Sequence, residues 1–247
     1  MKVRLIEMDP VWESPSENIK KADCMIRLGE PADLYVLPEM WATGFVVKPF
    51  GVAEEEKDSE ALSWMKQTAK SLNCAICGSL AVRSADNHYC NRHFFVTPNN
   101  VIFYDKRHLF SHGGEKEYYT CGERPVIAEW QGFRFLLQTC YDLRFPVFSR
   151  YGRAGEYDAI IYVANWPASR MLAWQVLTRA RAIENQCYVI AVNRIGCDPQ
   201  TTYEGGSCVI DPKGQIISLS TESDEAELSK ERLLYLRNRF NVLADRD

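Results

Sequence analysis

The chain has 247 residues, of which 46% are hydrophobic and 25% are charged, and its net charge is −4. This composition is ordinary for a globular protein with a large core, and without a basic block it gives no electrostatic support for a nucleic-acid partner. The opening residues, MKVRLIEMDP, lack the apolar region of a signal peptide, and the longest apolar run, Ala159 to Ala164, is too short to cross a bilayer, so we expect no membrane partner.

The first elements are predicted to be a strand, a helix and a second strand. Residues 3–8 form a short apolar-rich strand. Ser14-Pro15-Ser16-Glu17 has the form of a capping box with proline at the first helical position, and it predicts a helix that stops at Gly29. Residues 34–37 predict a buried strand that runs directly into Pro38-Glu39. A strand–helix–strand order favours a parallel pair of strands.

A second helix and three strands are predicted next. The apolar face of the helix is made of Leu62, Met65, Ala69 and Leu72. The strands are apolar segments bounded by turn residues, and they cover residues 74–82, 89–97 and 101–104. Residues 112–122 are rich in glycine and charge and predict a loop.

The second half of the chain repeats this mixture. Residues 126–130 and 133–139 predict a hairpin around Gln131-Gly132, and residues 159–164 predict a central strand. A long helix is predicted over residues 171–186. Its apolar face is expected to carry Trp174, Leu177, Ala180 and Ile183. The last elements are strands at residues 187–192, 208–211 and 215–219, and a charged, partly helical segment at residues 225–239.

No linker, repeat or low-complexity segment interrupts the sequence, so we predict a single domain over residues 1–247. The order of elements describes two similar halves of mixed sheet, and each half needs a helical cover. We therefore predict an α/β protein of two stacked sheets with helices on both outer faces. Such helices leave one face partly apolar, which favours self-association. The nine cysteines show no compact disulfide spacing and indicate reduced thiols in a cytoplasmic protein.

Three polar residues stand at the ends of predicted strands: Glu39, Lys106 and Cys140. Ligands of open α/β sheets bind beyond the carboxyl ends of the strands, so a base, a cation and a nucleophile at three such ends make a coherent chemical set. Cys140 lies between the strand at 133–139 and a segment, 143–151, that is predicted to be helical. A helix N-terminus carries a partial positive charge, so we expect it to stabilise a thiolate at Cys140.

Three segments of the chain resemble the signature segments of a known family. They read Leu37-Pro38-Glu39-Met40, Tyr104-Asp105-Lys106-Arg107-His108 and Cys140-Tyr141-Asp142-Leu143-Arg144-Phe145-Pro146. In residue type and in order they are similar to those of the nitrilase (carbon–nitrogen hydrolase) superfamily. Further matches extend the resemblance over essentially the whole chain, at residues 163–167, 179–186, 193–194 and 239–247. Within the superfamily, the segments around Lys106 and Asn165 most resemble the omega-amidase branch, which removes ammonia from 2-oxoglutaramate or 2-oxosuccinamate.

This resemblance implies a four-layer α-β-β-α sandwich, commonly paired into homodimers, and a small-molecule amide as the partner. It also implies that Glu39 is the general base, Lys106 the cationic stabiliser and Cys140 the nucleophile. A thiolate splits the hydrolysis of an amide into two easier steps through a thioester, and this chemistry needs no metal and no organic cofactor. The backbone N–H of Tyr141 is expected to join Lys106 in holding the oxyanion.

A second glutamate is common in this family, in the loop that follows the lysine. Counting back from Gly122 favours Glu115, with Glu117 as the alternative. The expected role is to orient Lys106 and the substrate amide. Cys121 stands where the family usually has proline, which loosens this alignment.

The carboxylate of a 2-oxo acid amide needs a cation, and Arg170, which follows Trp166-Pro167, is the first candidate. Arg144 and Arg194 are expected instead to make structural pairs with carboxylates. We expect the aromatic side chains of the substrate pocket to be Phe45, Tyr141 and Trp166.

Several other functions stay open at this point. Cys74-x-x-Cys77 with His88, Cys90 and His93 has residue types suited to a zinc site or a redox pair. A papain-like cysteine enzyme is disfavoured because its local signature is missing. The nearest rival is hydrolysis of another linear amide, such as an N-carbamoyl amine or a modified dipeptide. A catalytically silent binding or scaffold protein is the alternative of another class, and the presence of all three strand-end residues argues against it.

Overall fold

The computed structural model describes residues 1–221 and 223–246, and over these residues the strands form two large sheets and a two-stranded ribbon. The first sheet contains β1 (Lys2–Leu5), β2 (Leu34–Val36), β3 (Glu54–Glu55), β4 (Ala75–Arg83), β5 (Tyr89–Val96), β6 (Val101–Asp105) and β15 (Glu225–Glu227). The second contains β7 (Val126–Trp130), β8 (Phe133–Thr139), β9 (Ala159–Ala164), β10 (Tyr188–Asn193), β13 (Cys208–Ile210) and β14 (Ile216–Leu219). The ribbon pairs β11 (Ile195–Cys197) with β12 (Thr202–Glu204).

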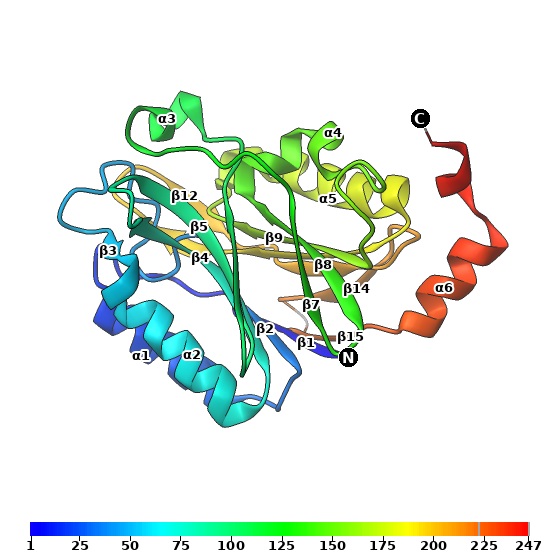
Figure 1. Cartoon of the computed structure of the whole chain (residues 1–247), viewed down its shortest axis with the longest axis horizontal. Helices are drawn as coiled ribbons and strands as arrows, with labels where there is room; N and C mark the ends of the chain where they lie inside the picture. The colour runs from blue at the N-terminus through cyan, green and yellow to red at the C-terminus, as the bar shows by residue number, and fades with distance from the viewer. Residues whose placement is uncertain (222, 247) are drawn as a thin grey trace.

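Both sheets are mixed, and helices lie on their outer faces. The strand order is β15-β1-β2-β4-β5-β6 in the first sheet and β14-β13-β10-β9-β8-β7 in the second. Helices α1 (Pro15–Leu28) and α2 (Glu60–Leu72) lie side by side on the first sheet, and α5 (Met171–Asn185) packs on the second (Figure 1). The predicted four-layer α-β-β-α sandwich is confirmed.

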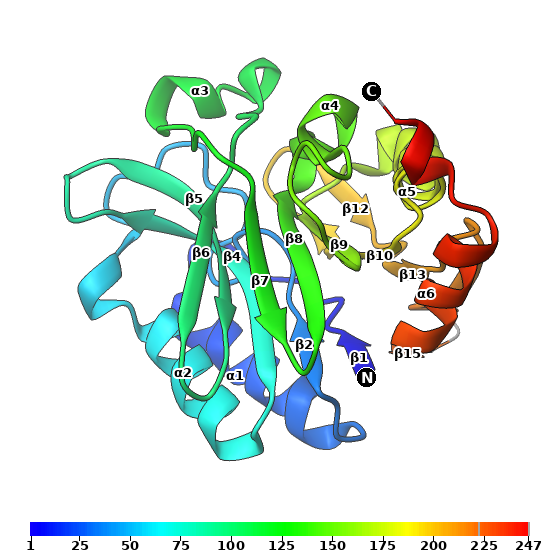
Figure 2. The ribbon, with the colours of Figure 1, turned by 45° about the vertical axis from the view of Figure 1, so that its right-hand side comes forward.

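Three shorter helices complete the described chain. They are α3 (Glu115–Tyr118), α4 (Pro146–Ser149) and α6 (Lys230–Arg239). Figure 2 shows α3 and α4 above the same end of the two sheets, while α6 follows β15 along the side of the molecule. Among residues 1–221 and 223–246, no helix combines the length and the apolarity that a membrane span requires.

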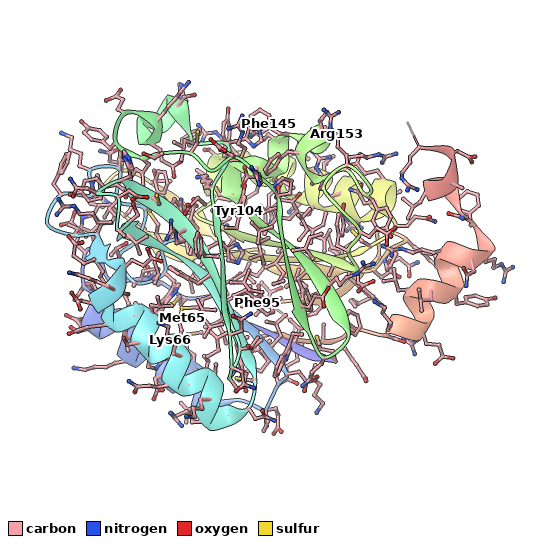
Figure 3. All side chains as sticks on the ribbon, viewed as in Figure 1. Met65, Lys66, Phe95, Tyr104, Phe145 and Arg153 are labelled. Atoms are coloured by element: carbon pink, nitrogen blue, oxygen red, sulfur yellow. The ribbon has the colours of Figure 1, made fainter. Side chains whose placement is uncertain are left out.

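The central core fills the space between the two sheets. Phe95 of β5 and Phe135 of β8 are fully buried, and their rings stack 5.6 Å apart across the two sheets. Figure 3 labels Phe95 near the middle of the molecule and Met65 on the side of α2 that faces the first sheet. Burial of one such large apolar side chain contributes about 1.5–3 kcal/mol, so the packed layers fix the positions of the strand ends.

Local pairing agrees with two of the predictions. β1 and β2 pair in parallel, as their connection by α1 required. β7 and β8 form an antiparallel hairpin whose turn residues, Gln131 and Gly132, have φ angles of 45° and 78°. Positive φ at both central residues matches the twist of the flanking strands, which explains why a glycine stands in this turn.

The predicted apolar face of α5 is confirmed for Trp174, which is buried, and for Leu177, which packs against the same core, but it is wrong for Ile183. Ile183 is 52% exposed, whereas the buried face of the helix includes the polar residues Arg181 and Asn185. These side chains are buried because they bind backbone groups of the segment after Cys140: Arg181 donates to the carbonyl oxygen of Leu143 at 2.7 Å, and the Asn185 carbonyl accepts from Tyr151 N–H at 2.9 Å. The polar face of α5 thus anchors the segment that carries Cys140.

Two other local predictions need correction. The Ser14 hydroxyl donates to the Glu17 carboxylate at 3.2 Å, and it makes no capping bond to a backbone N–H of α1. Residues 225–227, expected within a partly helical segment, form β15 and pair with β1. The chain therefore returns from the second sheet to complete the first.

Candidate active site

The ends of β2, β6 and β8 bring together the three residues singled out in the sequence. Glu39 and Lys106 are fully buried, and the Lys106 Nζ donates to Glu39 Oε1 at 2.8 Å. Cys140 follows β8, and its Sγ lies 3.8 Å from the carbonyl oxygen of Asn165, whose own backbone N–H donates to Glu39 Oε2 at 2.9 Å. One residue, Asn165, therefore contacts both the carboxylate and the thiol.

Glu115 joins this group, whereas Glu117 does not. Glu115 is fully buried at the start of α3, and its Oε2 accepts from Lys106 Nζ at 2.8 Å and from the backbone N–H of Phe110 at 2.6 Å. Glu117, on the other side of the same short helix, is exposed. Glu115 is thus the one of the two glutamates that the fold places beside Lys106.

The electrostatics of the buried group follow from two carboxylates around one ammonium. Burial by itself would lower the pKa of Lys106, but the carboxylates of Glu115 and Glu39 outweigh it and hold the pKa well above its ordinary value. Burial raises the pKa of Glu115, and Lys106 opposes that rise. Lys106 therefore stays protonated.

Asn91 is a member of the site that our sequence reasoning missed. It lies on β5, fully buried, and its Nδ2 donates to Glu39 Oε1 at 2.8 Å and to Glu115 Oε1 at 2.9 Å. An amide that donates to two carboxylates holds them at a fixed separation on either side of the ammonium. The available signal was a polar residue inside a strand that is buried along almost its whole length.

Asn165 was also missed as a site residue, although the motif around it was recognised. Its Nδ2 donates to the backbone oxygen of Glu39 at 2.8 Å, in addition to the bond from its N–H to the Glu39 side chain. It directly follows β9, the strand next to β8 in the second sheet. Asn165 thereby joins the end of the second sheet to the loop after β2 of the first.

Cys140 occupies a strained turn and rests as a thiol. Its φ is 45°, in the left-handed region, and it begins a 3₁₀ helix, Cys140–Arg144. Burial, followed by the nearby Glu39 carboxylate, raises the pKa of the thiol well above its ordinary value, and Lys106 only partly opposes this rise. The expectation that a helix N-terminus stabilises a thiolate here is wrong, because burial dominates and the helix has a single turn.

Cys140 opens onto a cavity of about 600 Å³. All four residues predicted to bind the substrate line this cavity: Phe45, Tyr141, Trp166 and Arg170. The Tyr141 ring meets Phe110 edge to face at 5.2 Å, and the Arg170 guanidinium lies 5.3 Å from the centre of the same Phe110 ring. An aromatic wall with a half-buried cation suits a small anionic molecule.

The other two arginines behave differently from each other. Arg194 is fully buried and its Nη2 donates to Asp9 at 2.8 Å, which agrees with the predicted structural pair. Arg144 lines the cavity, 5.0 Å over the Trp166 ring, and within residues 1–221 and 223–246 it makes no ion pair. The expectation of a structural pair for Arg144 is therefore not met, because its side chain extends toward the cavity instead.

Further parts of the cavity wall were not predicted as site residues. They come mostly from loops of both halves and comprise Trp12, Glu13, Val46, Val47, Lys48, His112, Gly113, Pro167, Asp198, Pro199, Gln200, Thr201 and Tyr203. No periodicity marks such loop residues, because their positions depend on where the packed strands end.

The geometry of the cysteine-rich segment contradicts the alternative of a zinc or redox site. Cys74 packs in the core between the first sheet and its helices, whereas Cys77 packs in the core between the sheets. Burial raises the pKa of the Cys74 thiol to about 12 and that of Cys77 well above its ordinary value. In the part of the chain that the structure describes, no three His, Cys, Asp or Glu side chains are grouped as metal ligands would be.

Comparison with known proteins agrees with this geometry. The chain is 40% identical over 253 residues to a protein named omega-amidase YafV from Escherichia coli (strain K12), covering 100% of this chain and 97% of that protein. It is 35% identical over 219 residues to a 2-oxoglutaramate amidase of Bacillus subtilis (strain 168), covering 87% and 85%.

A solved structure extends the similarity to three dimensions. XC1258 from Xanthomonas campestris, described as a CN-hydrolase superfamily protein with an arsenic adduct in the active site, matches with a TM-score of 0.94 at 37% identity, over 100% of this chain and 97% of that one. The model of the carbon-nitrogen hydrolase family matches residues 2–233. The chain therefore belongs to the carbon–nitrogen hydrolase family.

Proposed function

We propose that this protein is an omega-amidase, which hydrolyses the terminal amide of a short 2-oxo acid, such as 2-oxoglutaramate or 2-oxosuccinamate, to a carboxylate and ammonia. The observation that carries the proposal is the thiol of Cys140 at a cavity lined by Arg144 and Arg170, neither of which makes an ion pair with a described carboxylate. The buried group of Glu39, Lys106 and Glu115 lies beside this thiol. The names of the relatives from Escherichia coli and Bacillus subtilis support the same substrate class.

In the first half of the reaction, Glu39 takes the proton of the Cys140 thiol while Sγ attacks the amide carbon. Because the thiol is held neutral, a base within reach is required, and Glu39 is the carboxylate beside it. Lys106 and the backbone N–H of Tyr141 stabilise the oxyanion that forms, and donors of this kind contribute roughly 3 kcal/mol each. Glu39 then returns its proton to the departing nitrogen, which leaves as ammonia.

In the second half, water attacks the thioester with Glu39 again as the base. The acid product leaves, and the proton that Glu39 has taken goes back to Sγ of Cys140. Glu115 and Asn91 hold Lys106 and Glu39 in place throughout, because Glu115 accepts from Lys106 and Asn91 donates to Glu39. Every step uses side chains and backbone groups of this chain.

The substrate class follows from charge around the cavity. A 2-oxo acid amide carries its carboxylate at the end opposite to the amide, so the carboxylate needs a cation some distance from Cys140. Arg170 is half-buried, lines the cavity and makes no ion pair with a described carboxylate. Arg144 is a second cation of the same wall. A substrate without a charge would leave both arginines unused.

The direct test is ammonia release from three amides in parallel: 2-oxoglutaramate, an uncharged aliphatic amide such as butyramide, and an N-carbamoyl amine. We expect the highest kcat/KM for 2-oxoglutaramate, and a Cys140→Ala variant that is folded but inactive. Highest activity on the N-carbamoyl amine would instead identify another amide hydrolase. A wild-type protein that releases no ammonia from any of the three would support the silent-protein alternative and refute the proposal.

A further inference from the structure

A further buried carboxylate, Asp142, lies two residues after Cys140 and outside the group already described. It is fully buried, and three residues contact its two oxygens. Its Oδ2 accepts from the hydroxyl of Tyr104 at 2.7 Å and from the backbone N–H of Thr139 at 2.9 Å. Its Oδ1 accepts from the backbone N–H of His108 at 2.9 Å and contacts Nδ1 of the same residue at 2.8 Å.

These donors come from the two segments that carry the reacting groups. Tyr104 and His108 lie two residues before and two residues after Lys106, at the end of β6 in the first sheet. Thr139 immediately precedes Cys140, at the end of β8 in the second sheet. The side chain of Asp142 therefore connects the segment around Lys106, in the first sheet, to the turn at Cys140, in the second sheet.

The connection is rigid on both sides. Burial, followed by the charge of Asp142, raises the pKa of Tyr104 well above its ordinary value, so the hydroxyl stays a donor. Its oxygen in turn accepts from the backbone N–H of Arg107, the residue after Lys106, at 2.9 Å. The His108 ring stacks on Phe145 with centres 3.9 Å apart and an angle of 10°. Figure 3 labels Tyr104 and Phe145 in the upper part of the molecule, where these segments meet.

The position of this carboxylate points to a role in the reaction as well as in the fold. Cys140 sits at a φ of 45°, which is unfavourable for a residue with a side chain and persists only where the surroundings enforce it. Asp142 accepts from the N–H of Thr139, the residue before Cys140, and so it helps to hold that turn closed. Reacting groups misplaced by about 1 Å can lose about 100-fold in rate.

We infer that Asp142 is a positioning residue. Through its bonds to Tyr104, His108 and Thr139, it keeps Sγ of Cys140 in a fixed position relative to Lys106 and Glu39. It does not touch the substrate. The inference rests on the proposed amide hydrolysis for its rate effects, and it deepens that proposal by naming what aligns two segments far apart in the sequence.

The main test is Asp142→Asn, measured with 2-oxoglutaramate. One oxygen of Asp142 accepts from the His108 backbone N–H and the other from the Thr139 backbone N–H, so either orientation of the new amide turns its NH₂ group toward a donor, and the turn has to shift. We expect kcat to fall about 100-fold with KM changed less than threefold. The matched control is Asp158→Asn. Asp158 is also buried, accepts from the Arg134 N–H at 2.8 Å, and lies at the opposite end of β9, so its loss is expected to lower Tm and leave kcat within twofold.

A second variant and a second readout keep the inference testable if Asp142→Asn does not fold. Tyr104→Phe removes the hydroxyl that donates to Asp142 and accepts from the Arg107 N–H, and it keeps the packed ring. We expect it to lower kcat about tenfold. The rate at which iodoacetamide labels Cys140 is followed by peptide mass spectrometry, with the exposed Cys24 of the same sample as the reference. We expect the ratio of the two labelling rates to fall at least fivefold in both variants.

The outcomes separate this inference from the proposed function. Variants that keep kcat and the labelling ratio within twofold of the wild type, even with a lower Tm, would make Asp142 purely structural. An equal loss of kcat in Asp158→Asn would overturn it as well. A wild type that hydrolyses none of the amides would defeat the proposed function alone, because the labelling ratio still decides whether Asp142 positions Cys140.

Discussion

The sharpest test of the buried group is Glu115→Gln, with Glu117→Gln as its control. Glu115 accepts three bonds, from Lys106 Nζ at 2.8 Å, Phe110 N–H at 2.6 Å and Asn91 Nδ2 at 2.9 Å. Glutamine keeps the shape but has one acceptor oxygen, so its NH₂ group must face one of these donors. With the charge gone, Lys106 is left to Glu39 alone, and the base becomes weaker.

The size of the effect follows from the bonds that change. A hydrogen bond to a charged group contributes about 1.5–3 kcal/mol, and each 1.36 kcal/mol of barrier is a factor of ten, so we expect kcat to fall about 10- to 150-fold. KM should change little, because Glu115 is fully buried behind the cavity wall. Ammonia release from 2-oxoglutaramate measures both constants, with circular dichroism to verify folding. A folded Glu115→Gln variant with kcat within threefold of the wild type, or an equal loss in Glu117→Gln, would refute the reasoning.

Three further results are expected. Arg170→Ala should raise KM for 2-oxoglutaramate about 10- to 150-fold and leave KM for butyramide unchanged, because only 2-oxoglutaramate has a carboxylate that the arginine can bind. Equal changes in the two KM values would show that Arg170 does not bind the substrate carboxylate. Burial lowers the pKa of His93 from 6.5 to about 3, so the unfolded chain takes up its proton first as the pH falls below 6.5. Urea titrations measure the free energy of unfolding at each pH. Between pH 6.5 and pH 3, this free energy should fall by about 1.4 kcal/mol per pH unit more in the wild type than in His93→Gln. If the free energies of the two proteins fell in parallel with pH, this prediction would be contradicted. Leu172 and Val176 are 76% and 54% exposed and lie one turn apart on α5, so we expect a homodimer interface on this face of the helix. Light scattering should then show a dimer for the wild type and a monomer for the Leu172→Glu, Val176→Glu double variant. A monomeric wild type would contradict this prediction.

Much of the fold could be predicted because its strands are apolar and bounded by recognisable turns. The limits predicted for the strands at 126–130, 133–139 and 159–164 agree with β7, β8 and β9 residue for residue. Parallel strands and their crossover helices place strand ends at a common edge, which is why Glu39, Lys106 and Cys140 were expected to meet there. The compartment and the single-domain organisation stay predictions.

The contacts that complete the site had a weaker signal. Asn91 belongs to no recognised motif, and its two bonds depend on the register that sets β5 beside β4 and β6. The polar face of α5 was missed for a similar reason. Arg181 and Asn185 are satisfied by backbone groups distant in sequence, so hydrophobic periodicity found Trp174 and Leu177 but left out these polar residues and included the exposed Ile183.

The protonation state of Cys140 connects these observations. A cysteine that precedes a helix in the sequence predicts a thiolate, but the observed helix is a short 3₁₀ helix and the Cys140 side chain is buried. The ammonium nearest to the sulfur is already bound by Glu39 and Glu115, so little of its charge is left to stabilise a thiolate. In the proposed reaction, proton removal must therefore accompany attack on the amide, and we expect the placement of Glu39 beside the sulfur to set the rate. For this reason we expect Asn91 and Asp142, which do not line the cavity, to matter for the chemistry.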